Sequence, residues 1–233
     1  MKKLVCILLV VMLVVCCVAC GESESSTQNG GSNSVQGTDD SSKNNATEEI
    51  SEVTEAIVRA YKTAPASDFE YEVDGDGIKI NKYVGSDSIV VIPDKIDGKP
   101  VTQLKSYLFA NESSVKGVLI PNTVSTLIYT FTNNKDIQVV ICEDVERIQD
   151  FTFANCPQLR TLENGTKLVE LGQNSISVCP KLEELTIPST LTNISDSVGW
   201  SVFYSCANLT IVGEGGSYIE SFCNVNNIPF KSK

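Results

Sequence analysis

One apolar position recurs along the second half of the chain. It is occupied in turn by Phe109, Phe131, Phe153, Ile176 and Phe203, at spacings of 22, 22, 23 and 27 residues. Self-similarity at a period of about 20 to 50 residues is the sequence signature of repeat architectures, in which each repeat is one structural unit. The chain is therefore expected to wind into a stack of similar coils.

Three further positions keep the same register. They fall three, six and nine residues after the recurring one, and hold Glu112, Asn134, Cys156, Cys179 and Cys206, then Val115, Ile137, Leu159, Leu182 and Leu209, then Val118, Val140, Leu162, Leu185 and Val212. A unit of this length cannot close its own core, whereas stacked units place each apolar residue about 4.8 Å from its equivalent. The pattern predicts a mainly β solenoid over residues 89–233, with short strands and short helical or 3-10 turns.

The recurring residues spell Phe-x-x-Cys-x-x-Leu followed, in two of the coils, by Ile-Pro. Ile120-Pro121 and Ile187-Pro188 supply that dipeptide, and Ile92-Pro93 precedes the first coil in the same sense. This pattern resembles the leucine-rich repeat of bacterial surface protein A, called BspA-like, from Ile89 to about Lys233. Residues 92–101 look like the opening coil of that family, and residues 216–230 look like its terminal coil.

The sequence departs from the BspA-like pattern at a few positions. Glu112 and Asn134 stand in the Cys position, Cys142 stands in an Ile position, and Asn164-Gly165 replaces Ile-Pro. These departures indicate that the coils differ in shape. The resemblance implies an extracellular binding or adhesion protein, with no catalytic residues to carry over, although a fold alone does not fix a function.

The first twenty residues have the order of a bacterial export signal. Met1-Lys2-Lys3 is basic, and residues 4–19 form an uncharged apolar run of sixteen residues. The run ends at Val18-Ala19-Cys20-Gly21, which resembles a lipobox, so residues 1–19 are predicted to be a lipoprotein signal peptide and Cys20 the lipidation site. An uncleaved membrane anchor is the alternative, but sixteen helical residues reach only about 24 Å, against a bilayer core of roughly 30 Å.

Two segments separate Cys20 from the repeats. Residues 20–46 are almost wholly polar, and they are predicted to be a disordered tether with a reach of roughly 26 to 31 Å. Residues 47–88 are predicted to form an N-terminal cap made of one amphipathic helix, over 47–62, and a β-hairpin that turns at Asp74-Gly75-Asp76-Gly77. A calcium loop at these aspartates is disfavoured because an EF-hand needs a further series of oxygen ligands.

Charge and composition exclude several classes of function. Without residues 1–19 the chain has 16 basic and 29 acidic residues, a net charge of −13, which disfavours nucleic acid and anionic lipid as partners. The chain has no histidine, so Cys/His zinc sites and histidine-activated nucleophiles are ruled out. No pair of carboxylates stands out by its spacing. The sequence therefore indicates a protein that is not an enzyme and has no cofactor or metal.

Five cysteines remain beside Cys20 in the mature chain: Cys142, Cys156, Cys179, Cys206 and Cys223. Three of them, Cys156, Cys179 and Cys206, occupy equivalent positions of successive coils. They are expected to be buried free thiols, because free cysteine packs as a small hydrophobe. A disulfide between neighbouring coils is the alternative, since adjacent coils can approach disulfide distance.

The longest repeat step contains the single tryptophan of the chain. The step of 27 residues before Phe203 has about four residues more than its neighbours, so residues 195–201 are expected to loop outward. Trp200 lies in this insertion and is a candidate partner-binding residue, because tryptophan is enriched among interface anchors. The alternative is that Trp200 folds back and covers the open end of the last coil.

These observations favour a lipoprotein on the outer face of the bacterial cell membrane. It would be held to the membrane by lipid on Cys20 and bind a protein or glycan through its leucine-rich-repeat surface. The alternative is a structural or scaffold component of a cell-envelope complex.

Overall fold

The computed structural model describes residues 51–111, 114–195 and 201–233. The chain divides after Thr47, and every described residue belongs to the second unit, Glu48–Lys233. Cys20, Trp200 and the segments predicted to be signal peptide and tether lie outside the described residues.

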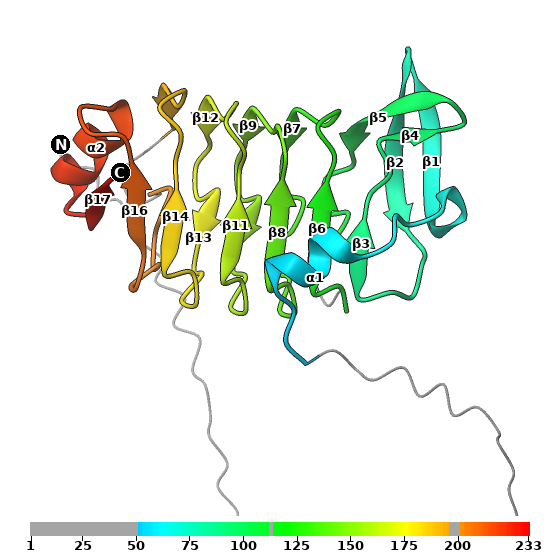
Figure 1. Ribbon diagram of the computed structural model, residues 1–233, viewed down its shortest axis with the longest axis horizontal. Coiled ribbons are helices and arrows are strands. Elements are labelled where there is room, and N and C mark those ends of the chain that lie inside the picture. The colour runs from blue at the N-terminus through cyan, green and yellow to red at the C-terminus, as the bar shows by residue number, and fades with distance from the viewer. Residues whose placement is uncertain (1–50, 112–113, 196–200) are drawn as a thin grey trace, which may run out of the picture. The chain divides into compact units, whose positions relative to one another are not determined.

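Residues 89–232 form the predicted solenoid, in which strands of successive coils pair into sheets (Figure 1). One face, here called the main face, contains seven strands: β3 (Ile89–Val91), β6 (Gly117–Ile120), β8 (Val139–Cys142), β11 (Thr161–Glu163), β14 (Glu184–Thr186), β16 (Thr210–Gly213) and β17 (Phe230–Ser232). A second sheet contains β7 (Thr126–Leu127), β9 (Arg147–Ile148), β12 (Glu170–Leu171) and β15 (Asn193–Ile194), and a third pairs β10 (Phe153–Ala154) with β13 (Ile176–Ser177). The strands of these sheets pair in parallel, and the predicted fold class is confirmed.

The recurring apolar position forms the core of the solenoid. Phe109, Phe131 and Phe153 are fully buried and stack, with ring centroids 5.4 and 5.1 Å apart. Ile176 and Phe203 continue the same column and are also buried. Because equivalent side chains stack on one another, each coil packs its apolar side chains against those of the next coil, as the period of the sequence predicts.

The N-terminal cap contains the predicted hairpin. β1 (Phe69–Asp74) pairs antiparallel with β2 (Gly77–Tyr83), and the turn between them uses Gly75 in the left-handed region, at φ 60°. β2 also pairs parallel with β5 (Lys99–Leu104), which carries the short strand β4 (Lys95–Ile96) on its other edge. The hairpin thus extends the solenoid at its N-terminal end (Figure 1).

The N-terminal helix is shorter than the predicted span of residues 47–62. The helix α1 covers only Glu55–Ala60, and residues 66–68 form one 3-10 turn, η1 (Ala66–Asp68). Thr54 caps α1 by accepting a hydrogen bond from the backbone N–H of Ile57, at 3.4 Å. The described residues just before this cap contact solenoid side chains that are far away in the sequence. A helical periodicity in the sequence does not reveal such contacts.

The C-terminal end is closed by a second helix, α2 (Tyr218–Asn226), and by β17. Ser217 caps the helix at its start, and Asn227 ends it in the left-handed region, at φ 55°. α2 buries Ile219 and Cys223 against the last coil. The terminal coil that the sequence predicts is thus a helix followed by a strand.

Candidate functional site

The main face of the solenoid has two chemically different halves. Outward side chains of β3, β6 and β8 are apolar or absent, namely Ile89, Gly117, Leu119, Val139 and Ile141. In the same register, the outward side chains of β11, β14 and β16 are mainly polar, namely Thr161, Glu163, Glu184, Thr186 and Thr210. The change from apolar to polar takes place between two neighbouring strands, β8 and β11.

The apolar half is covered by α1. Val53 and Val58 are buried against Ile89, Val139 and Ile141. Gly117 makes room for the helix, because a Cβ atom there would lie 2.7 Å from Val58 Cγ2. Figure 1 shows α1 crossing β6 and β8 and leaving β11, β14 and β16 open. This half of the face is therefore part of the core and not a free surface.

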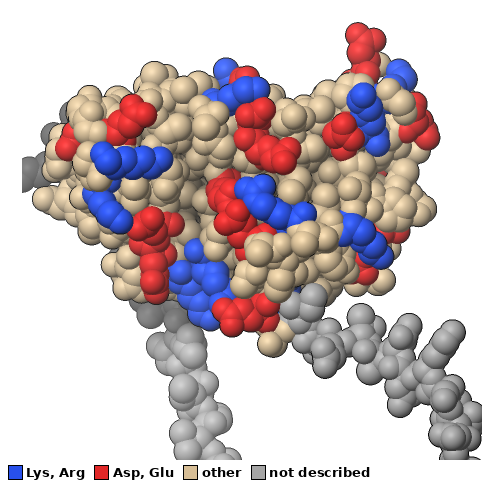
Figure 2. All heavy atoms as spheres, in the orientation of Figure 1, with Lys and Arg blue, Asp and Glu red and all other residues tan. Residues whose placement is uncertain are grey.

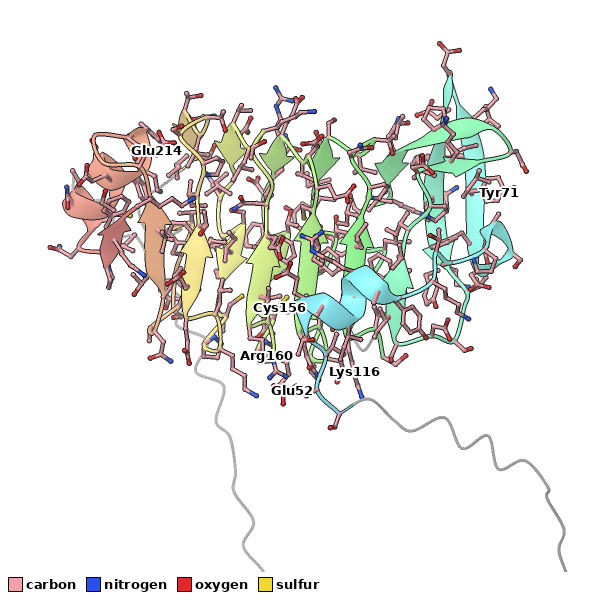
Figure 3. The ribbon with its side chains drawn as sticks, viewed as in Figure 1. Glu52, Tyr71, Lys116, Cys156, Arg160 and Glu214 are labelled. Carbon is pink, nitrogen blue, oxygen red and sulfur yellow. The ribbon has the colours of Figure 1, made fainter. Side chains whose placement is uncertain are left out.

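Polar contacts hold the α1 segment at the border between the two halves. Gln138 accepts a hydrogen bond from Val53 N, at 2.8 Å, and donates one to Ser51 O, at 3.2 Å. Arg160 bonds to Gln138 Oε1, at 2.7 Å, and forms an ion pair with Glu52 (Figure 3). These hydrogen bonds and this ion pair hold the α1 segment in place at the edge of the open half.

The open half is interrupted between β11 and β14. The two strands are in contact, yet among the described strands no backbone ladder joins them, and β14 pairs instead with β16. The coil between them has 23 residues instead of 22, and here Asn164-Gly165 replaces Ile-Pro. Asn164 Nδ2 donates to Thr186 O across the break, at 3.0 Å. The departure from the repeat pattern thus coincides with an irregularity in the sheet.

A hollow of about 560 Å³ opens at this break. Its lining comes from α1, β11, the Asn164-Gly165 turn and β14, and includes Glu55, Leu162, Glu163, Glu183, Glu184 and Thr186. A second depression, lined by Glu183, Glu184, Asn208, Thr210 and Lys231, continues over β16. Figure 2 shows acidic and basic side chains together over the middle of this face. The lining of this hollow comes from three separate parts of the chain.

Two carboxylates of the hollow share one guanidinium. Arg59 pairs with Glu55, at 2.7 Å, and also with Glu163. Burial and the hydrogen bond that its protonated carboxyl donates to Glu55 raise the pKa of Glu163, whereas the hydrogen bond that Glu55 accepts from Arg59 lowers the pKa of Glu55. Two acids thus lie within hydrogen-bonding distance with one cation between them.

The three equivalent cysteines are free in the structure, and two of them are fully buried. Cys156 and Cys179 have no exposed surface, while Cys206 is partly exposed. Each thiol points at a carbonyl oxygen of the preceding coil: Cys156 Sγ lies 3.2 Å from Phe131 O, Cys179 Sγ 3.1 Å from Phe153 O, and Cys206 Sγ 3.5 Å from Ile176 O. In these three coils the cysteine therefore acts as a hydrogen-bond donor and not merely as a small apolar group.

Asn134 explains why the cysteine position tolerates an amide. Its Nδ2 donates to Phe109 O, at 2.7 Å, in the same relation to the preceding coil. Its Oδ1 accepts from the N–H groups of Asp136 and Ile137, at 2.9 and 2.8 Å. Sequence reasoning treated Asn134 as a departure, and the structure shows that it performs the same task.

The described part of the chain offers no cluster of three or more ligating side chains for a metal ion. None of its helices has the length and apolar character that crossing a membrane requires. Sequence reasoning did not single out Glu55, Glu163, Glu183 or Glu184. In the sequence, the 23-residue step and Asn164-Gly165 fall in the same coil. This coincidence was the feature from which the irregular coil could have been found.

Comparison with known proteins agrees with this geometry. The BspA type leucine-rich repeat region matches residues 92–210 in six copies, a little over half of the chain. None of the curated proteins matches the chain.

Two solved structures are similar to this one. A leucine-rich repeat protein of T. pallidum is 25% identical, with a TM-score of 0.57 over 65% of this chain and 71% of that one. A leucine-rich repeat protein from Bacteroides ovatus is 21% identical, with a TM-score of 0.53 over 66% of this chain and 41% of that one. The repeat pattern, the solenoid and the family match agree, and the chain belongs to the BspA-type leucine-rich-repeat proteins.

Proposed function

We propose that this protein is a lipid-anchored cell-surface protein that binds a protein or glycan through the open half of its main face. The observation that carries the proposal is the division of that face. The apolar half is covered by α1, whereas the polar half over β11, β14 and β16 is uncovered and contains the hollow. A solenoid presents an extended surface of this kind to its partners.

The repeat family supports binding over catalysis. Leucine-rich-repeat proteins are typically binding proteins without enzymatic activity. Three carboxylates of the hollow form ion pairs, Glu55 and Glu163 with Arg59 and Glu184 with Lys231.

The proposed anchor is lipid on Cys20, supported by the Val18-Ala19-Cys20-Gly21 junction. A diacylglyceryl group has two acyl chains, and two membrane signals are needed for stable attachment. In cells that express the full chain, Cys20→Ser should move the protein from the membrane fraction to the soluble fraction. Equal membrane retention of the parent and the variant, with no processing of the parent precursor, would reject the lipid anchor.

A pair of matched substitutions tests the binding face. Thr186 and Asn193 are both exposed strand residues, on the main face and on the second sheet respectively. On full-length protein, Thr186→Arg should abolish binding to the partner found in a panel of surface glycans and extracellular proteins, and Asn193→Arg should leave that binding unchanged. Loss with Asn193→Arg alone would place the site on the second sheet and contradict the proposal.

A further inference from the structure

A second column of aromatic rings stacks outside the core of the solenoid. Tyr107, Tyr129 and Phe151 each stand two residues before the buried phenylalanine of their coil. The ring centroids of Tyr107 and Tyr129 are 5.2 Å apart, with 32° between the ring planes, and those of Tyr129 and Phe151 are 5.5 Å apart, with 10° between the planes. The ring of Tyr107 is 54% exposed, and the other two are partly exposed. The column is therefore open to reagents in solution.

The backbone holds these rings in register. All three residues adopt the left-handed conformation, with φ of 69°, 53° and 54°, which is uncommon for bulky side chains. The N–H of Tyr107 donates to Tyr129 O, at 3.3 Å, and the N–H of Tyr129 donates to Asp150 O, at 3.2 Å. Because successive coils repeat one turn geometry, each ring lies over the next at a spacing typical of stacked aromatic pairs.

Two of the three rings are phenols. The chain has seven tyrosines, and among the described residues Tyr107 and Tyr129 are the one pair of tyrosine rings in contact. A phenol, unlike the phenyl ring of Phe151, can lose one electron and one proton to become a phenoxyl radical. The unpaired electron of such a radical is shared with the ring carbons next to the oxygen-bearing carbon. Two phenols held in contact are thus placed to couple at these carbons.

From this geometry we infer that Tyr107 and Tyr129 form an oxidative modification site, at which a dityrosine bond joins two neighbouring coils. This inference goes beyond the proposed binding function and does not depend on it. The oxidant is hydrogen peroxide activated by a haem peroxidase.

The reaction balances as follows. Each phenol gives one electron and one proton to the oxidant, and the two radicals form one carbon–carbon bond between their ortho carbons. Each of these carbons then passes its hydrogen to its own ring oxygen, which restores both phenols. Two tyrosines and one hydrogen peroxide thus give one dityrosine and two waters.

The bond would stabilise the repeat column where it forms. Tyr107 and Tyr129 are 22 residues apart, so the cross-link closes a loop of one full coil. A cross-link restricts the unfolded chain, and in a solenoid each coil is held mainly by its neighbours. The cross-linked protein is therefore expected to resist separation of the coils that contain Phe109 and Phe131.

The experiment treats the full-length protein, at low concentration, with hydrogen peroxide and a haem peroxidase. The monomer is isolated by size exclusion, and its dityrosine fluorescence and melting temperature are measured. Tryptic digestion should yield the peptides 106–116 and 117–135 joined, with a mass two hydrogen atoms below their sum. The melting temperature of the treated monomer should rise by several degrees.

Matched variants separate the stacked pair from other tyrosines. Tyr129→Phe should abolish the joined peptides and keep the ring stack, because Phe151 already occupies the equivalent position of the next coil. Tyr204 is 57% exposed and lies in a later coil, so Tyr204→Phe should leave the yield of the joined peptides unchanged. Neither variant should change the melting temperature of the untreated protein.

A treated monomer without the joined peptides would overturn the inference, and so would dityrosine found only between separate molecules. An equal loss of the joined peptides in Tyr204→Phe and Tyr129→Phe would also overturn it, because the coupling would then not depend on the stacked pair.

Discussion

At the scale of single residues, the cysteine position makes the same hydrogen bond in the coils that hold Asn134, Cys156, Cys179 and Cys206. The sequence predicted that Cys156 and Cys179 would be buried, but it could not reveal their acceptors, because the carbonyl groups belong to the preceding coil. Asn134 shows that the shared property is the donor, since its amide bonds to the equivalent carbonyl. A buried carbonyl that loses its partner is costly, which explains why the position admits few residue types.

Asn134→Ala should lower the free energy of unfolding by about 2 to 4 kcal/mol, because it leaves one carbonyl and two backbone N–H groups without partners in the interior. Chemical denaturation of the purified protein measures this change. Asn122→Ala, at an exposed position, is the control and should change stability by less than about 0.5 kcal/mol. A loss no larger than that of the control would show that the hydrogen bonds of Asn134 do not stabilise the coil.

The thiols should react slowly in the folded protein. Burial raises the pKa of Cys223 to about 11, and contact with a neighbouring thiol together with burial raises those of Cys179 and Cys206, so little reactive thiolate forms at neutral pH. Cys206, which is partly exposed, should be alkylated before Cys156 and Cys179. Mass spectrometry of the unreduced protein, alkylated after unfolding, should find all three as free thiols. A disulfide between any two of them would refute this prediction.

At the scale of elements, the sequence predicted the repeating strands well and the docking of α1 poorly. The strands follow from apolar positions that recur within one coil, which is local information. The position of α1 depends on Gly117 and Gln138, which are far from the helix in the sequence and become its neighbours only after the coils have stacked. The helix was also predicted too long, because the periodicity gave no weight to the cap at Thr54.

Gly117→Val should displace α1 from the main face, because even a Cβ at this position would lie 2.7 Å from the stiff side chain of Val58. The expected result is faster proteolytic cleavage within residues 51–60, with a loss of about 1 to 3 kcal/mol of stability from overpacking. Thr186→Val, on the open half, is the matched control and should leave cleavage unchanged. Unchanged cleavage of the Gly117 variant would contradict the docking of α1.

A further prediction at the scale of elements concerns the role of Trp200, which lies outside the described residues. If it contacts a partner, Trp200→Ala should abolish partner binding and leave the melting temperature unchanged. If it covers the end of the last coil, the same substitution should lower the melting temperature by several degrees, as expected when about 1 to 2 kcal/mol is lost from a domain of this size. Calorimetry and a binding assay on the same variant separate the two roles.

At the scale of the whole molecule, the proposed membrane anchor is inferred from the sequence, and the proposed binding surface is inferred from the structure. The export signal and the lipidation of Cys20 could be proposed from the sequence because they rest on linear motifs. The hollow could not be predicted, since its carboxylates come from α1, β11 and β14, and only the 23-residue step with Asn164-Gly165 pointed to that coil. The division of the main face into a covered and an open half leaves one surface of the proposed anchored protein available to a partner.

Carboxyl footprinting tests this division most directly. The full-length protein is labelled with a carbodiimide and an amine, with and without its bound partner, and the modified residues are identified by mass spectrometry. We predict that the partner protects Glu183 and Glu184 on the open half from labelling. Glu146, beside the second sheet, and Glu170, within it, should be equally reactive with and without the partner. Protection of Glu146 and Glu170 with no change at Glu183 and Glu184 would contradict the central claim that the open half of the main face is the binding surface.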